Sequence, residues 1–262
     1  MDLGLKSRRA VVGGASSGLG LAIAAQLAAE GCRLLLWARH ADRLDKAADD
    51  LRARYEADVA TTVADAEDPL AAHLVAERAR EALGGVDILV LNAGGPSPVD
   101  PAQTQPEQWR AAFQLLVITP VALATALLPS MRERRWGRIV AVLSWGIRLP
   151  IPDLVYSNAG RLALVAWLKT VATVVGPDGV TVNGVVPGRF DTPRVAFLDR
   201  ARAQRVGRPV ESVRAEQRAG IPIGRYGRTD EFAAHVVFLC SDLASYQTGT
   251  FTPIDGGLIK GL

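Results

Sequence analysis

Eight residues near the start of the chain have the composition of a phosphate-binding turn. Residues 13–20 read Gly-Gly-Ala-Ser-Ser-Gly-Leu-Gly and lie between an apolar run and a segment with apolar residues at helical spacing. Glycines let the backbone approach a pyrophosphate, and a helix N-terminus offers unpaired N–H groups and the positive end of the helix dipole. We therefore expect a dinucleotide-binding turn. Its cofactor-binding residues are Gly14, Ser16, Ser17, Gly18, Leu19 and Gly20.

The end of the second apolar run bears on which dinucleotide binds there. An NAD site places a carboxylate about 20 residues past the glycines to hold the ribose 2′-hydroxyl. Here residues 37–40 read Trp-Ala-Arg-His, with no carboxylate. A guanidinium at Arg39 can pair bidentately with a 2′-phosphate. The sequence predicts NADP(H) as the cofactor, with NAD(H) less favoured and a merely solvent-facing Arg39 as the alternative.

Three more short motifs follow apolar runs of the chain. An aspartate follows the third run and could accept a hydrogen bond from an adenine amino group. Asn-Ala-Gly follows the fourth, where small residues allow close approach to a ribose, and Pro-Gly with a later threonine follows the sixth, near the expected nicotinamide. Parallel strands bring their carboxyl ends to one edge of a sheet, so we expect these motifs to complete the cofactor site. The residues are Asp65, Asn92, Ala93, Gly94, Pro187, Gly188 and Thr192.

Strand-like and helix-like segments alternate along the whole chain. Apolar runs without polar alternation are typical of parallel strands covered on both faces. We expect an α/β fold, a single doubly wound Rossmann domain with a seven-stranded parallel sheet. The expected strands are 9–13, 33–37, 58–64, 86–91, 138–143, 180–186 and 251–254. The expected helices are 19–30, 42–57, 68–83, 106–131, 155–175 and 230–240.

Residues 190–226 interrupt this alternation. They contain no strand-like run, many arginines, and two helix-like pieces around residues 207 and 209. A segment after the sixth strand lies at the edge of the sheet where ligands bind. We expect a helical lid over the substrate, with a plain surface excursion as the alternative. No linker marks a second domain, so residues 1–262 are predicted to form one dinucleotide-binding domain.

Composition narrows the classes of function. The 262 residues carry a net charge of +3, spread along the chain, and the densest basic cluster, residues 132–138, is expected to be a solvated turn rather than a nucleic-acid site. Two cysteines without ligand spacing predict reduced thiols and no metal site. The longest apolar run, 115–128, contains Pro120 and is shorter than a membrane span. We therefore expect a cytoplasmic protein that binds neither nucleic acid nor membrane.

Taken together, these motifs resemble the short-chain dehydrogenase/reductase family over essentially the whole chain. Within the family the sequence is most similar to the β-ketoacyl carrier-protein reductase group. The resemblance implies a single Rossmann domain, a homo-oligomer (tetramer or dimer), and hydride transfer between a nicotinamide and a carbonyl or alcohol. The matching residues are Gly14-x3-Gly18-x-Gly20, Asn92-Ala93-Gly94, Ser144, Tyr156, Val182-Asn183, Pro187-Gly188 and Asp255-Gly256-Gly257.

The catalytic tetrad of that family is incomplete here. The resemblance implies a serine at Ser144 that holds the substrate oxygen and a tyrosine at Tyr156 that transfers the proton. These two residues are twelve apart, one fewer than the family's usual spacing. The lysine expected four residues after the tyrosine is replaced by Gly160, and the asparagine of the long helix by Leu116.

Two arginines are candidates for the missing positive charge. Arg161 is five residues from Tyr156, about 140° round a helix, so it is expected to face another way. Arg189 follows the Pro187-Gly188 motif and could supply charge from another direction. Without a cation nearby, a neutral phenol at Tyr156 can still donate a proton to a developing alkoxide.

Two hypotheses about function follow. The first is an NAD(P)H-dependent ketoreductase that reduces a small-molecule carbonyl to a secondary alcohol, with Tyr156 and Ser144 polarising the carbonyl and a non-standard proton source. That source could be water or a hydroxyl beside the ketone. The second is a nucleotide-binding protein without catalysis, acting as a sensor or structural subunit, which the loss of lysine and asparagine favours. Slow NADPH oxidation with an activated ketone or quinone would distinguish the two.

Overall fold

The computed structural model describes residues 1–261. Its centre is one seven-stranded sheet in the order β3-β2-β1-β4-β5-β6-β7, with every neighbouring pair parallel. The chain reverses its direction of travel across the sheet after β3, as a doubly wound sheet requires. The predicted Rossmann fold is thereby confirmed. The strands are β1 Arg9–Gly13, β2 Arg33–Ala38, β3 Val59–Val63, β4 Ile88–Leu91, β5 Gly137–Val142, β6 Val180–Pro187 and β7 Phe251–Ile254.

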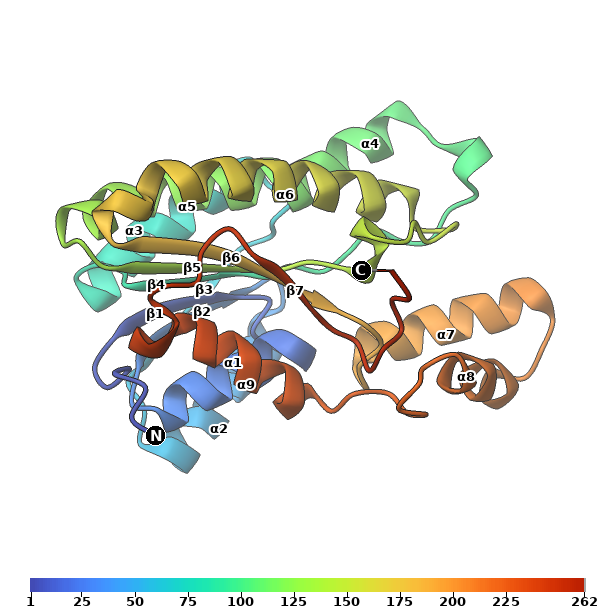
Figure 1. The fold of residues 1–262 in the computed structure, drawn as a ribbon, viewed down its shortest axis with the longest axis horizontal. Coiled ribbons are helices and arrows are strands. Elements are labelled where there is room, and N and C mark those ends of the chain that lie inside the picture. Colours follow the sequence, from blue (N-terminus) through green and yellow to red (C-terminus); the bar gives the residue numbers. More distant parts are fainter. Residues whose placement is uncertain (262) are drawn as a thin grey trace.

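Helices cover both faces of the sheet, as Figure 1 shows. Alternate strand residues point to opposite faces, so the core divides into two clusters, one containing Val11, Leu35 and Leu89 and the other Val12 and Leu36. One face carries α1 Gly18–Ala29, α2 Ala41–Tyr55 and α9 Thr229–Cys240; the other carries α3 Ala71–Leu83, α5 Thr119–Glu133 and α6 Val155–Val175. The carboxyl ends of the strands face right in the view, toward α4 Pro106–Phe113, α7 Pro193–Val206 and α8 Val210–Ala219.

Most predicted boundaries lie within one residue of the observed ones, and two of the larger departures have local causes. Helix α3 begins at Ala71 rather than at residue 68, because the Asp68 carboxylate accepts a hydrogen bond from the backbone N–H of Leu70 at 2.9 Å and holds a turn. Strand β4 begins at Ile88 rather than at residue 86, next to Asp87, which is bound by Arg9 at 2.7 Å.

The predicted helix 106–131 is instead three segments in one continuous rod. A π-helical turn, Gln114–Ile118, separates α4 from α5. Pro120 lies in the first turn of α5, where its missing N–H costs little. Thr119 donates its hydroxyl to the backbone carbonyl of Ala66 at 2.8 Å and accepts from Gln114 at 2.9 Å. π-Helical turns within α-helices frequently mark functional sites, and this one contains Leu116.

Two helical rods, Pro106–Glu133 and Val155–Asp178, are long and apolar enough to span a membrane by length and composition alone. The first is longer than the apolar run seen in the sequence, because Pro120 does not interrupt it. Both rods lie across one face of the sheet, where α5 and α6 contribute Leu123, Leu164 and Leu168 to the core. Their apolar residues therefore pack against the sheet in the helix layer that covers it.

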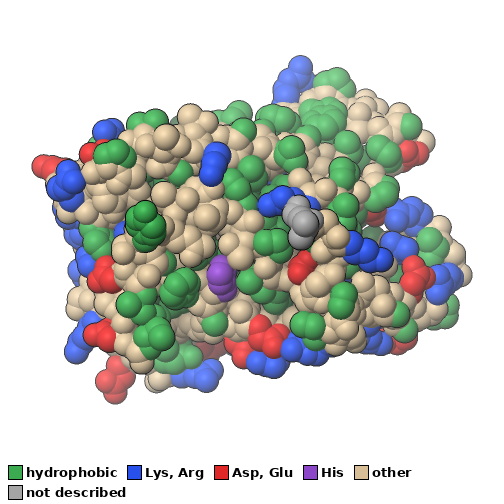
Figure 2. Space-filling view, viewed as in Figure 1, with side chains coloured by type: hydrophobic (Ala, Val, Ile, Leu, Met, Phe, Trp, Pro, Cys, Tyr) green, Lys and Arg blue, Asp and Glu red, His purple; other side chains and the backbone are tan. Residues whose placement is uncertain are grey.

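The predicted lid segment stands off the carboxyl edge of the sheet as a pair of helices, α7 and α8. Figure 2 shows Lys and Arg side chains gathered over this part of the molecule. The pair is tied down by Asp199 of α7, which is 1% exposed, accepts from the Tyr226 hydroxyl at 3.0 Å and pairs with Arg189 and with Arg214. A buried carboxylate with two guanidinium partners fixes the helices relative to the end of β6.

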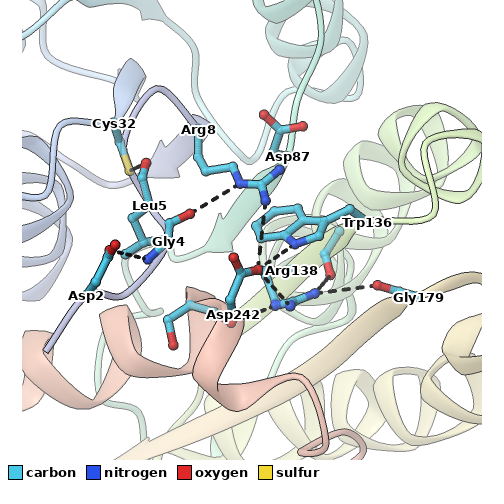
Figure 3. Close-up of polar contacts among 12 residues, drawn as sticks. Asp2, Gly4, Leu5, Arg8, Cys32, Asp87, Trp136, Arg138, Gly179 and Asp242 are labelled. Atoms are coloured by element: carbon cyan, nitrogen blue, oxygen red, sulfur yellow. Dashed lines mark hydrogen bonds and ion pairs between the residues drawn. The ribbon is translucent and has the colours of Figure 1, made fainter.

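The amino edge of the sheet, opposite the lid, carries a separate arginine cluster (Figure 3). Trp136 lies between two guanidinium groups, with Arg8 3.7 Å and Arg138 4.3 Å from its ring centroid, and its indole N–H donates to Asp242 at 2.8 Å. Arg138 is 2% exposed, so the basic segment 132–138 is not solvated throughout, as the sequence had suggested. Its charges are used for packing and internal pairing.

Candidate functional site

The glycine turn of residues 13–20 connects β1 to α1 and lies against the end of β4. Gly14 and Gly18 have φ of +57° and +58°, a region that residues with a Cβ adopt rarely. A Cβ on Gly14 would lie 2.7 Å from Nδ2 of Asn92, and one on Gly20 would lie 2.3 Å from the carbonyl oxygen of Gly14. These glycines are therefore required by close approach as well as by backbone conformation.

Asn92 joins the predicted Asn-Ala-Gly motif to this turn. Its side-chain amide donates a hydrogen bond to the carbonyl oxygen of Gly13 at 2.9 Å. The carboxyl ends of β1 and β4 are thereby fixed to each other, and Ala93 and Gly94 continue from that point with little side-chain bulk. The structure thus brings the first and fourth strand motifs together, as the sequence predicted.

The start of α1 has the features of an anion site. Ser17 is its N-cap residue, and the Ser17 side chain makes no capping hydrogen bond, so the N–H groups of the first turn point outward unpaired. A Cβ on Gly18 would lie 3.5 Å from the Cγ2 atom of Thr192. Thr192 caps α7, its hydroxyl accepting from the N–H of Val195 at 3.2 Å. The glycine turn and the start of the lid therefore face each other across a narrow gap.

The Pro187-Gly188 motif closes the same edge. The Gly188 N–H donates to the carbonyl oxygen of Ile254 at 2.9 Å, and a Cβ on Gly188 would lie 2.6 Å from Cα of Asp255. The sixth strand end is thereby held against the Asp-Gly-Gly motif that follows β7. Only glycine allows this approach of two backbones.

Arg39 and Asp65 lie at the far side of this edge, after β2 and β3, and both are exposed. Within residues 1–261 Arg39 has no acidic partner at ion-pair distance, so its guanidinium is available to a ligand. Asp65 accepts from the N–H of Glu67 at 3.1 Å, which leaves its second carboxylate oxygen for another donor. Both positions suit the adenosine end of a dinucleotide that lies along the strand ends.

Ser144 lies two residues beyond β5. Its hydroxyl oxygen accepts from the N–H of Gly146 at 3.1 Å and caps a short 3-10 turn, Trp145–Ile147. This contact uses an acceptor position of the oxygen, so the hydroxyl hydrogen remains available. Ser144 can donate a hydrogen bond to a carbonyl oxygen placed over the strand end.

Tyr156 has a different environment. It is 3% exposed, and its hydroxyl donates to Oε1 of Gln108 at 2.7 Å and accepts from the N–H of Gln105 at 3.0 Å. Its ring packs edge-on against Trp109 at a centroid distance of 4.7 Å. The Tyr156 proton is therefore committed to α4, and its role as proton donor stays a prediction.

Gly160 and Leu116, which the sequence analysis predicts to replace two tetrad residues, touch each other. Gly160 of α6 lies against the π-helical turn, and a Cβ there would lie 3.1 Å from both Cβ and Cδ1 of Leu116. Any side chain at residue 160 would point between α6 and this turn. The glycine permits the two helices to pack closely.

Arg161 was expected to face away from the site, and this expectation is wrong. The angle from Tyr156 is as predicted, but Arg161 points to the strand ends, where its Nη1 donates to the carbonyl oxygen of Val142 at 2.6 Å. It lines a cavity of about 20 Å³ together with Asn92 and Ala93. Arg189, the other candidate cation, is occupied by Asp199.

Burial and charge act together on Arg161. It is 9% exposed, and burial followed by the positive charge of Arg194 lowers the pKa of its guanidinium to about 10. Arg194, at the start of α7, donates to the carbonyl oxygen of Pro96 at 2.6 Å and so ties the lid to the loop after β4. Sequence reasoning considered Arg161 but set it aside, because the rotation of α6 was measured from Tyr156, and it did not single out Arg194.

The glycine turn, the N-terminus of α1 and the polar strand ends define a dinucleotide-binding α/β protein. The sequence model of a family described as "Enoyl-(Acyl carrier protein) reductase" matches residues 14–259. The chain therefore belongs to the short-chain dehydrogenase/reductase family, within its ketoreductase-like part.

Known relatives match the whole chain. The 3-oxoacyl-[acyl-carrier-protein] reductase of Escherichia coli is 31% identical over 256 residues, covering 98% of this chain and 99% of the relative. The D-beta-hydroxybutyrate dehydrogenase of Cupriavidus necator is 32% identical, covering 97% and 99%. Among solved structures, L-sorbose reductase from Gluconobacter frateurii, complexed with NADPH and L-sorbose, is 35% identical with a TM-score of 0.94 and full coverage of both chains. The chain is an oxidoreductase by family.

Proposed function

We propose that this protein is an NADP(H)-dependent oxidoreductase that reduces a small-molecule ketone to a secondary alcohol. The observation that carries the proposal is the single edge at which the glycine turn, Asn92, Gly188 and Thr192 meet. These groups meet at the carboxyl ends of the strands, which is where a doubly wound sheet binds its ligand.

The residues present fit a dinucleotide. The unpaired N–H groups at the start of α1 would hold the pyrophosphate, Asp65 the adenine, and the segment from Asn92 to Gly94 a ribose. Pro187, Gly188 and Thr192 would bound the nicotinamide. A bound nicotinamide supplies a hydride to a carbonyl carbon, while the protein positions the carbonyl and stabilises the charge that develops on its oxygen.

The choice of NADP(H) over NAD(H) rests on Arg39. Its guanidinium is exposed and without an acidic partner among the described residues, beside the position where an NAD site has a carboxylate. The L-sorbose reductase of similar fold is complexed with NADPH. A charge-assisted pair between Arg39 and a 2′-phosphate would discriminate between the two cofactors.

Catalysis begins with Ser144, whose free hydroxyl hydrogen can polarise the substrate carbonyl. Relatives and neighbours differ in substrate, since their names give carrier-bound 3-oxoacyl groups, hydroxybutyrate and sorbose. The lid of residues 190–226 would set specificity, because Arg194 connects it to the loop beside the strand ends.

A nucleotide-binding protein without catalysis is the second candidate, favoured by Gly160 and Leu116 in place of a lysine and an asparagine. We prefer the enzyme because Ser144 keeps an available hydroxyl and Arg161 places a cation beside the cofactor loops. Oxidation of NADPH by any member of a panel of hydroxyketones, cyclic diketones and quinones would decide for the enzyme. Tight binding with no turnover across the panel would decide for the binder.

The cofactor assignment is tested by titrating NADPH and NADH, followed by nucleotide fluorescence, against the wild type and Arg39→Ala. We expect NADPH to bind more tightly, and the substitution to weaken it about tenfold or more while leaving NADH unchanged. Arg54→Ala, an exposed arginine at the far end of α2, is the matched control and should change neither affinity. Absence of binding by both nucleotides to the wild type would refute the proposed function.

A further inference from the structure

Helix α6 presents one face to the strand ends, and the contacts of its residues identify that face. Tyr156 reaches α4, and Gly160 packs on Leu116 of the π-helical turn. These two residues, four apart, mark the face of α6 that contacts α4 and the π-helical turn. The residues one position further along the helix make different contacts.

Arg161 defines the face that looks toward the strand ends. Its Nη1 donates to the carbonyl oxygen of Val142, two residues before Ser144, and its guanidinium lines the cavity shared with Asn92 and Ala93. Asn158 is tied to the same region, since a Cβ on Gly146 would lie 2.4 Å from its Oδ1. Helix α6 is therefore fixed to both sides of Ser144.

Ser157 lies on the same face as Arg161, because residues four apart are stacked along one side of a helix. It is 7% exposed, and no hydrogen bond to its hydroxyl is formed by any residue from 1 to 261. It is thirteen residues after Ser144, so this pair has the spacing that Ser144 and Tyr156 miss by one. A hydroxyl that no described residue engages is available to a ligand.

The charge of Arg161 also lacks a partner. No carboxylate lies within ion-pair distance of it in the described chain, and the charged group that acts on it is another cation, Arg194 of α7. A guanidinium has five N–H donors, and Val142 takes one of them. Burial of an unpaired charge is costly, so the position is explained by a ligand that accepts the remaining N–H groups.

We infer that Ser144, Ser157 and Arg161 form the active-site set, with Arg161 as its cation and Ser157 as its second hydroxyl, while Tyr156 is a packing residue that fastens α6 to α4. This inference rests on the proposed function and assigns its residues. Arg161 would bind the ribose hydroxyls of the cofactor and stabilise the substrate oxygen.

Reduction of a carbonyl at this site requires a proton for the substrate oxygen. When the carbonyl carbon accepts a hydride, the C=O π bond breaks and its electron pair moves to the oxygen. The hydroxyls of Ser144 and Ser157 donate hydrogen bonds to that oxygen, and the guanidinium of Arg161 offsets its negative charge. The oxygen takes the Ser157 proton, and Ser157 takes one in turn from water, so the net proton comes from solvent.

The test compares Arg161→Met, Arg161→Lys, Ser157→Ala and Tyr156→Phe by NADPH affinity, thermal midpoint and turnover. We expect Arg161→Met to weaken NADPH binding about tenfold or more, and Arg161→Lys to recover most of the loss. Ser157→Ala should keep NADPH affinity and lower kcat about tenfold or more, whereas Tyr156→Phe should keep affinity within about twofold and lower the thermal midpoint.

Arg138→Met is the matched control, since Arg138 is the buried arginine at the opposite end of β5 and binds the carbonyl oxygen of Ser241 at 3.0 Å. It should lose stability without losing NADPH affinity. Should Arg161→Met fail to fold, Arg161→Lys carries the test. A buried lysine titrates at lower pH than an arginine, so its NADPH affinity should fall with rising pH while that of the wild type holds.

One charged side chain, Arg194 of α7, faces Arg161 and contributes to this pH dependence. The other residues lining the cavity carry no titratable group. Wild-type affinity in Arg161→Met, or loss of turnover in Tyr156→Phe but not in Ser157→Ala, would overturn the inference and leave the cofactor assignment intact. Failure of the wild type to bind either nucleotide would instead overturn the proposed function.

Discussion

The hydroxyl of Tyr156 donates a hydrogen bond to Oε1 of Gln108 at 2.7 Å and so connects the start of α6 to α4. The backbone N–H of Gln105 completes the contact at 3.0 Å. A tyrosine that the sequence analysis predicts to be catalytic is thus engaged in holding two helices together.

Removal of the Tyr156 hydroxyl should cost stability through its partner. We expect Tyr156→Phe to lower the free energy of unfolding by about 1–2 kcal/mol, because Gln108 and the N–H of Gln105 lose a partner. Gln108→Leu should cost a similar amount, and the double variant less than the sum by about 0.5 kcal/mol or more. Urea denaturation of the four proteins measures this coupling, and strict additivity would show that the hydrogen bond contributes nothing.

A lysine introduced at residue 160 should not create a working active site. We expect Gly160→Lys to destabilise the protein by about 3 kcal/mol, since its Cβ would stand 3.1 Å from Leu116 and its charge would enter an apolar helix contact. Gly176→Ala is a control, because nothing lies within 4 Å of a Cβ there and its backbone is helical. Thermal unfolding measures both, and a Gly160→Lys protein as stable as the wild type would contradict the packing described.

The ion pair between Asp87 and Arg9 should make stability depend on pH. Burial would raise the pKa of Asp87, but hydrogen bonds and charge from Arg9, then Arg134, more than offset it, so its pKa is lowered. Its stabilisation is therefore full above the unfolded pKa of about 3.9 and is lost as pH falls through the lower folded value.

We expect Asp87→Asn to lose about 3 kcal/mol at pH 7, with the difference from wild type shrinking below pH 4. Asp58→Asn removes an exposed pair with Arg33 (2.7 Å) and should cost at most about 0.5 kcal/mol. Denaturant unfolding at several pH values gives the comparison. An Asp87→Asn deficit that persists unchanged at pH 2 would exclude the ion pair as its cause.

The family resemblance implies a homo-oligomer, and we expect the chains to associate through the long apolar helices α5 and α6. The exposed apolar side chains of α6 allow a test. Leu162 is 48% exposed and Val174 60%. We expect Leu162→Glu to reduce the native mass from an oligomer toward the monomer, because a charge in an apolar contact is costly. Leu74→Glu on α3, also 48% exposed, should leave the mass unchanged. Light scattering on a size-exclusion column measures both, and a monomeric wild type would refute the prediction.

Sequence alone was sufficient for the sheet, for most element boundaries and for the meeting of several motifs at the carboxyl edge of the sheet. The apolar runs of β1 to β7 are local patterns, and parallel pairing brings their carboxyl ends together regardless of detail. The meeting of Gly14 with Asn92, and of Gly18 with Thr192, follows from that rule. The π-helical turn could not be predicted in this way. Residues Gln114–Ile118 depart from α-helical hydrogen bonding through tertiary contacts such as that of Thr119 with Ala66.

What the sequence determined by itself is the fold, the glycine turn and the order of motifs along the sheet edge, because each depends on residue type and spacing within one segment. What only the tertiary structure decided is the rotation of α6 about its own axis. A helix turns by about 100° per residue, so a shift of one position exchanges Tyr156 and Gly160 for Ser157 and Arg161. The packing of Gly160 on Leu116 and the hydrogen bond of Arg161 to Val142 fix that rotation.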